Sequence, residues 1–146
     1  MADTLWHSSL DRFRTEVAAE HGKAAAVSIA CVTAVLGLSI LIKALRIKGD
    51  GRELVPIADK LIEELRRAAD ADAEALRAYV ETHDPLELRE VPAEAFHLAQ
   101  EAYGLCKQAA PLITGLFAAD VKVAAALIQG SRDAIEACIS ANLPDV

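Results

Sequence analysis

Apolar residues recur along most of this chain at spacings of three and four, which is the period of an α-helix. No window alternates apolar and polar residues with the period of two that indicates a half-buried strand. Gly and Pro residues divide the chain into five helical segments. The pattern therefore predicts an all-α protein of five helices, most simply a bundle, in a single domain over residues 1–146.

Breaks at Gly and Pro set the approximate limits of these helices. His21-Gly22 ends the first segment, and Gly49-Asp50-Gly51 is a clear break after the second. Pro92 suits the first turn of the fourth helix, because a proline there loses no hydrogen bond. The predicted helices cover, in order, about residues 9–20, 23–47, 54–82, 92–110 and 119–141.

The second helix contains the longest uncharged run, residues 24–42, with Lys23 and Lys43 on either side. Its length reaches the lower range for a membrane span. Its many small residues weaken insertion, and no aromatic residue marks either end, as is common in membrane helices. A helix that is apolar on all sides is also typical of the centre of a bundle. We therefore expect a buried central helix rich in small residues, with a membrane span as the alternative.

Composition and charge narrow the class of function. The net charge of −7 argues against a nucleic-acid surface, because phosphate contacts need clustered Lys and Arg. The three Cys residues are widely separated and form no CxxC motif, which fits reduced thiols in a cytoplasmic protein. The N-terminus lacks the basic stretch and apolar run of a signal peptide. The expected partners include neither nucleic acid nor membrane.

Asp72 is the most informative candidate for chemistry. It lies on the apolar stripe of the third helix, between Ala68 and Leu76, so its carboxylate should point toward the bundle interior. Buried acids are rare unless they are paired or functional. The alternative is an acid at the helix edge that is solvated or hydrogen-bonded to a neighbouring helix.

Other polar candidates have simpler explanations beside the functional one. Asp120 is either a site residue or a first-turn acid of the fifth helix, and Asn142 is either a site residue or a C-terminal residue of left-handed conformation. His21, before the buried helix, is a solvated loop residue or an acid/base beside a helix N-terminus. The pair His97 and Glu101 has metal-ligand spacing but no second pair, so no metal site is expected.

Five segments in order resemble the cyclodeaminase/cyclohydrolase family, whose members process formimino- or methenyl-tetrahydrofolate. They are SLDRF (9–13), AAAVSIACVTAVLGL (24–38), ADAEALRAY (71–79), VPAEAF (91–96) and ADVKVAAALIQGSRDAIEACISANL (119–143). The resemblance implies a divergent, shortened member with a cyclodeaminase-like helical fold. It also implies a homodimer that binds a folate-like ligand near the dimer interface.

The same resemblance suggests an enzyme of C–N bond chemistry, a lyase or hydrolase acting on a tetrahydrofolate derivative or another imine-type substrate, with no tightly bound cofactor. Asp72 would hold a proton or pair with the cationic nitrogen, and Asp120 would orient the substrate or a water. His21 would be the acid/base. Gly22, Lys23 and Asn142 would contact the substrate.

The chain departs from the family pattern at several positions. The family's Pro-Gly-Gly-Gly-Ser loop appears here as EHGKA (20–24), the serine before Asp120 is Ala119, and the first of two terminal asparagines is Cys138. These losses support an alternative function, a non-catalytic binding or regulatory module that keeps the fold. In either case we expect a homodimer in which the second or fifth helix packs across a two-fold axis.

Overall fold

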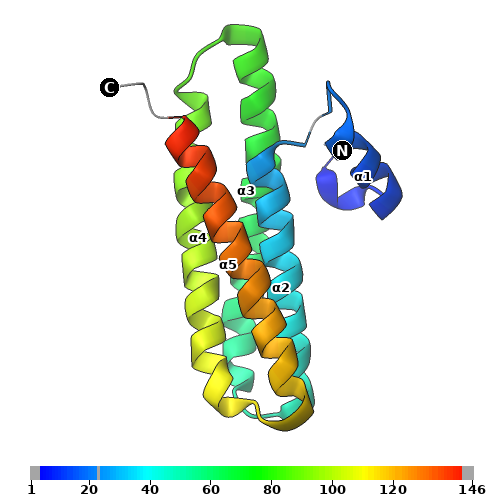
Figure 1. The fold of residues 1–146 in the computed structure, drawn as a ribbon, viewed down its shortest axis with the longest axis vertical. Helices are drawn as coiled ribbons and strands as arrows, with labels where there is room; N and C mark the ends of the chain where they lie inside the picture. Colours follow the sequence, from blue (N-terminus) through cyan, green and yellow to red (C-terminus); the bar gives the residue numbers. More distant parts are fainter. Residues whose placement is uncertain (1–3, 23, 143–146) are drawn as a thin grey trace.

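A computed structural model describes residues 4–22 and 24–142. The described residues form five α-helices and no strand, which confirms the predicted all-α class. Four of the helices form an antiparallel bundle, and the short α1 stands beside it (Figure 1). The helices are α1 (Leu10–Ala18), α2 (Ala26–Lys48), α3 (Val55–Thr82), α4 (Glu87–Ala109) and α5 (Ala118–Ala141).

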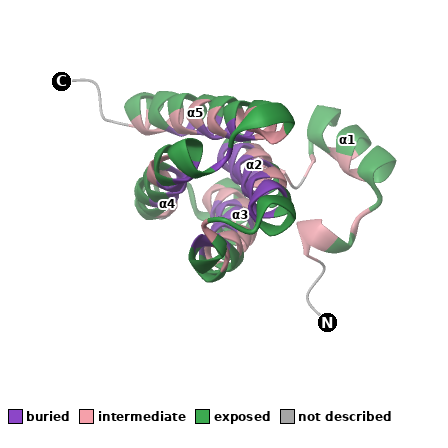
Figure 2. Ribbon diagram, turned by 90° about the horizontal axis from the view of Figure 1, so that it is seen from below, coloured by how far each residue is buried: buried purple, intermediate pink, exposed green. Residues whose placement is uncertain are grey.

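Each helix of the bundle packs mainly against two neighbours. Helix α2 lies against α3 and α5, and α4 lies against the same two helices from the opposite side. Viewed end-on, the buried residues gather on the inner faces of these four helices (Figure 2). Small side chains allow close approach: a Cβ on Gly37 of α2 would lie 3.2 Å from the carbonyl oxygen of Ala124 on α5. The core is therefore built from closely spaced helices rather than from large aromatic side chains.

Helix α2 has two apolar faces. Its inner face includes Cys31, Leu38 and Leu45, all 0% exposed. Among the described residues, α2 is the one helix long and apolar enough to cross a membrane, and 56% of its most apolar stretch is buried in the bundle. The other face carries a row of partly exposed residues, which we call the α2 outer row: Ile29, Val32, Leu36, Ile40 and Ile47.

The turn between α2 and α3 follows directly from its glycines. Gly49 adopts a left-handed conformation with φ of 77°, and its backbone N–H donates to the carbonyl of Leu45 at 3.0 Å. Glycine adopts this conformation without the steric cost that a Cβ brings, and it commonly ends helices in this way. The break predicted from Gly49-Asp50-Gly51 is thus the end of α2.

The predicted start of α4 is wrong by five residues. Helix α4 begins at Glu87, so Pro92 lies inside the helix instead of in its first turn. Proline has no backbone N–H and leaves the carbonyl four residues earlier, that of Leu88, without its helical donor. The side-chain Nδ2 of Asn142 donates to this oxygen at 3.0 Å. A residue from the end of α5 therefore compensates for the proline.

The N-terminal arm, residues 4–22, contains the 3-10 turn η1 (Leu5–His7) and α1. No residue of the arm is buried. Two apolar residues of α1 are exposed, Leu10 at 82% and Val17 at 37%. The core thus consists of α2 to α5, with α1 outside it.

Candidate functional site

Asp72 links α3 to the first turn of α2. The carboxylate is 5% exposed, and its Oδ2 accepts hydrogen bonds from the backbone N–H of Ser28 at 2.9 Å and from the Ser28 hydroxyl at 3.0 Å. The same hydroxyl lies 2.9 Å from the carbonyl oxygen of Ala69, so its single proton has two acceptors. Backbone N–H groups in the first turn of a helix have no partner within the helix. Asp72 therefore provides a cap for α2 from a neighbouring helix.

Burial raises the pKa of Asp72 above its usual value, although the two hydrogen bonds from Ser28 lower it. A protonated Asp72 can itself donate to the Ser28 oxygen, which frees the hydroxyl proton for the carbonyl of Ala69. The geometry around Ser28 thus accommodates the neutral acid as well as the carboxylate.

The thiols near the core are poorly suited to nucleophilic chemistry. Burial raises the pKa of Cys31 to about 12, with a smaller contribution from the charge of Asp72. Burial also raises the pKa of Cys106 to about 11, and that of Cys138 above its usual value. A cysteine attacks as the thiolate, so these high pKa values remove most of the reactive form at neutral pH.

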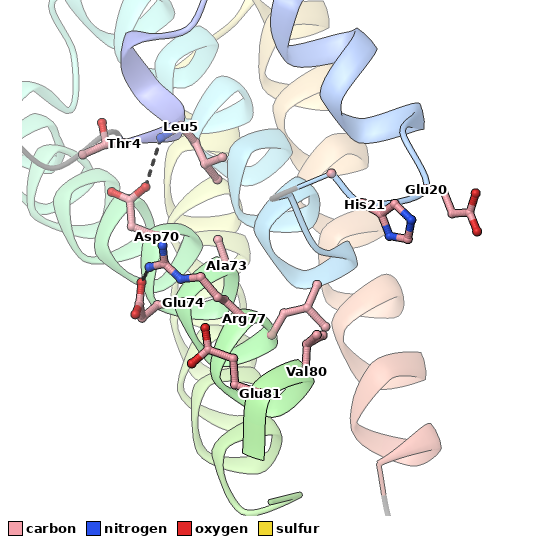
Figure 3. A pocket seen from close by; sticks show the side chains of 12 residues that line it. Thr4, Leu5, Glu20, His21, Asp70, Ala73, Glu74, Arg77, Val80 and Glu81 are labelled. Carbon is pink, nitrogen blue, oxygen red and sulfur yellow. Dashed lines mark hydrogen bonds and ion pairs between the residues drawn. The ribbon is translucent and has the colours of Figure 1, made fainter. Parts of the chain in front are cut away.

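A cavity of about 670 Å³ lies between the N-terminal arm and the outer face of α3 (Figure 3). On the arm side it is lined by His21 and Gly22, two of the residues predicted for the site. Its α3 wall combines apolar side chains, such as Leu76 and Val80, with a charged stripe at spacings of four, three and four residues. The members of this stripe are Asp70, Glu74, Arg77 and Glu81.

The cavity is lined by more acidic than basic groups. Arg77 is paired with Glu74, and the Oδ1 of Asp70 accepts a hydrogen bond from the backbone N–H of Leu5 at 3.2 Å. Glu20 and Glu81 line the cavity and are exposed. Carboxylates around a partly enclosed space favour a cationic guest over an anionic one.

Gly22 is required by the shape of the chain beside the cavity. A Cβ at this position would lie 1.9 Å from the carbonyl oxygen of Glu16, which no structure tolerates without backbone movement. The backbone N–H of Gly22 also donates to the carbonyl of Ala19 at 3.0 Å. Gly22 thus allows the chain leaving α1 to turn back tightly next to His21.

The structure does not bring the predicted acids together. Asp72 lies 17 residues from the start of α3, about 25 Å along the helix. Asp120 lies in the first turn of α5, near the opposite end, where Gly51 of the α2–α3 turn approaches Leu112 of the α4–α5 connection. Neither acid lines the cavity beside His21. Within one chain, Asp72, Asp120 and His21 therefore do not share a site.

The remaining candidate residues have different outcomes. Asn142 has φ of −88° and ψ of −3°, so the alternative of a left-handed conformation is wrong. Its side chain donates to the carbonyl of Leu88. Lys23 lies outside the described residues. His97 and Glu101 are both exposed, and the part of the chain that the structure describes holds no group of three potential metal ligands.

The α2 outer row continues onto α5 through a shallow groove of about 250 Å³. The α2 side contributes Ile29 and Thr33, and the α5 side contributes small residues such as Ala126, Gly130 and Ala134. This surface is mainly apolar and lies on the second and fifth helices, one or the other of which was predicted to pack across a two-fold axis.

The chain matches no family model, no curated protein and no solved structure. The resemblance to the cyclodeaminase/cyclohydrolase family therefore stays a prediction that rests on the five sequence segments.

Sequence reasoning missed Ser28 as the partner of Asp72, and it missed the charged stripe of α3 as a cavity wall. The stripe has a readable signal, because residues 70, 74, 77 and 81 fall on one helical face. Ser28 carries no such signal, since its role depends on how α2 packs against α3.

Proposed function

We propose that the protein binds a small organic cation that contains a C–N bond, such as an amine, amidine or iminium compound, in the cavity between the arm and α3. The acidic lining of this cavity is the observation that carries the proposal. Its carboxylates match the positive charge of the guest. The apolar wall formed by Leu76 and Val80 matches a carbon skeleton, as in most small-molecule sites.

His21 is the group in this cavity that we assign to proton transfer. An imidazole can both accept and donate a proton, so it can assist the addition of water to an iminium carbon and the departure of the nitrogen. The resemblance to a family that acts on methenyl- and formimino-tetrahydrofolate supports the same reaction class. Asp72, which caps α2, is left with a structural role in this proposal.

Binding is tested with two ligands of similar shape and opposite charge. Calorimetric titration should detect benzamidine, an amidinium cation, and should detect no binding of benzoate. Glu81→Gln should weaken benzamidine binding, because Glu81 lines the cavity and is exposed. Glu94→Gln is the matched control, since Glu94 is exposed on α4, outside the cavity lining. Equal heats with benzamidine and benzoate would remove the proposal.

Chemistry is tested by the loss of methenyl-tetrahydrofolate absorbance. A general acid/base typically contributes 10²–10⁴-fold, so His21→Gln should slow the reaction by roughly 10²-fold or more. Asp72→Asn and the surface control His97→Gln should retain rates close to that of the wild type. If the wild type and all three variants react only at the background rate, the protein lacks this activity and only the binding proposal remains.

A second candidate function is a homodimeric interaction module, and the α2 outer row is the observation that favours it. Leu36 is 55% exposed and Ile47 is 51% exposed on the most apolar helix of the chain. Exposed apolar patches commonly mark interaction sites, and in this row the charge of the exposed Lys43 lies between Ile40 and Ile47. A two-fold axis along the α2–α5 groove would bury this surface against the same surface of a second copy.

Light scattering on detergent-free protein tests the dimer. The wild type should have twice the mass of the chain at micromolar concentration, and Leu36→Glu should run as a folded monomer. Leu38 and Val35, although apolar, are unsuitable for this test because both are buried within the bundle. A wild-type monomer, or wild-type protein retained in the membrane fraction, would contradict the dimer.

A further inference from the structure

The described hydrogen bonds between the arm and the bundle gather at η1, where Leu5 and Trp6 also pack against the edge of the core. The backbone N–H of Leu5 donates to Asp70 Oδ1 at 3.2 Å, and the indole N–H of Trp6 donates to the carbonyl of Arg66 at 3.3 Å. The Arg66 guanidinium also lies over the Trp6 ring, 5.2 Å from its centroid. All three contacts join η1 to little more than one turn of α3.

The remainder of the arm adds little to this attachment. Helix α1 has no buried residue, and its packing against the other helices is marginal. Two ion pairs between described residues of α1, Arg12 with Glu16 and Arg14 with Asp11, lie within the helix and do not reach the bundle. Segments with few buried apolar contacts open at a lower free energy than the core that carries them.

The cavity depends on the docked arm, because its lining comes from two separate parts of the chain. Thr4, Leu5 and residues 20–22 form one side, and α3 between Asp70 and Glu81 forms the other. Figure 3 shows Thr4 and Leu5 beside Asp70 at one edge of the space, and Glu20 and His21 on the side away from Asp70 and Glu74. If η1 leaves α3, the arm side is lost and only an exposed helix face remains.

We propose that the N-terminal arm is a strap that docks on α3 and undocks from it as a unit while the four-helix bundle stays folded. The cavity then exists only in the docked state. A guest in the cavity binds that state alone and shifts the equilibrium toward it. This last step rests on the proposed function, whereas the movement of the strap does not.

Trp6 makes the strap observable, because it is the single tryptophan of the chain. In a urea titration of the whole protein, Trp6 fluorescence should report undocking at a lower urea concentration than the loss of helical circular dichroism. Arg66→Ala should lower the docking equilibrium constant by roughly two- to fivefold, as expected for one cation–π contact, and move only the fluorescence midpoint. Asp70→Ala, which removes the acceptor of the Leu5 N–H, should act in the same direction.

Glu63→Gln is the control for Arg66→Ala. It breaks the surface ion pair between Glu63 and Arg66 but leaves the guanidinium over Trp6, so it should move neither midpoint. The strap is overturned if the fluorescence and dichroism transitions coincide in the wild type and shift together in Arg66→Ala.

The same titration with benzamidine separates this inference from the proposed function. A rise of the fluorescence midpoint alone, with the dichroism midpoint fixed, supports both. Two separate transitions that benzamidine leaves unchanged support the strap and count against the cation site. Coincident transitions overturn the strap whether or not benzamidine binds.

Discussion

Asp72 is a buried acid that caps the first turn of α2 through Ser28, which is a structural role. The carboxylate accepts the backbone N–H and the hydroxyl of Ser28 in the first turn of α2. A buried N–H that loses its acceptor costs about 1–3 kcal/mol. We therefore expect Asp72→Ala to be less stable than Asp72→Asn by about this amount in urea unfolding, because asparagine keeps an acceptor oxygen.

Stability should also depend on pH through this residue. Burial raises the pKa of Asp72 in the folded protein, so the folded state holds the proton more tightly than the unfolded chain does. The resulting stabilisation is fully present below the unfolded pKa of about 4, and it is lost as the pH rises through the higher folded value. Wild type should lose stability relative to Asp72→Asn over this rise. A constant or opposite difference in unfolding free energy would contradict the assignment.

Asn142 and Pro92 are a second pair of residues whose roles are linked. The Asn142 side chain donates to the Leu88 carbonyl, which Pro92 leaves without its helical donor. Asn142→Ala should cost about 0.5–1.5 kcal/mol, the usual net value of such a hydrogen bond. In a Pro92→Ala background the backbone N–H returns, so the same change should cost less. Additive effects in this double-mutant cycle would show that the two residues act independently.

At the scale of the elements, the sequence was a good guide to the long helices and to most of their ends, and the largest error was the start of α4. Repeating apolar positions and the Gly49 turn predicted α2 and α3 closely, since both signals are local. The start of α4 was misplaced because Pro92 is normally a first-turn residue, and the donor that permits it inside the helix lies 50 residues away. A tertiary contact of this kind produces no signal in the sequence around Pro92, so the start of α4 could not be read from it.

The two faces of α2 should respond differently to truncation. Leu38 is fully buried, and Leu→Ala at such positions typically costs roughly 2–5 kcal/mol. Leu36 is 55% exposed, so in a monomer Leu36→Ala should change the unfolding free energy by less than about 0.5 kcal/mol. A dimer changes the second expectation, because Leu36→Ala would then lower stability more at high protein concentration. Urea unfolding at two protein concentrations distinguishes these cases.

At the scale of the whole molecule, the candidate site could be predicted only in part. His21 and Gly22 stand out in the sequence as the turn before an apolar helix, and both line the cavity. That the arm faces α3 at all depends on the docking of Trp6 on α3, 60 positions along the chain, which no periodicity encodes. Within one chain, Asp72 and Asp120 lie toward opposite ends of the bundle because of the direction of each helix, which the sequence pattern alone does not reveal.

Because two of its thiols are buried, the rate at which a reagent modifies them measures how fast the bundle opens. Cys31 and Cys106 are 0% and 1% exposed, and their pKa values of about 12 and 11 keep them protonated in the folded state. With excess disulfide reagent, their modification should wait for the bundle to open and should approach the unfolding rate once labelling is faster than reclosing. Cys138 is only partly buried and should react first. If all three thiols reacted at one rate in native buffer, the closed core described above would not exist in solution.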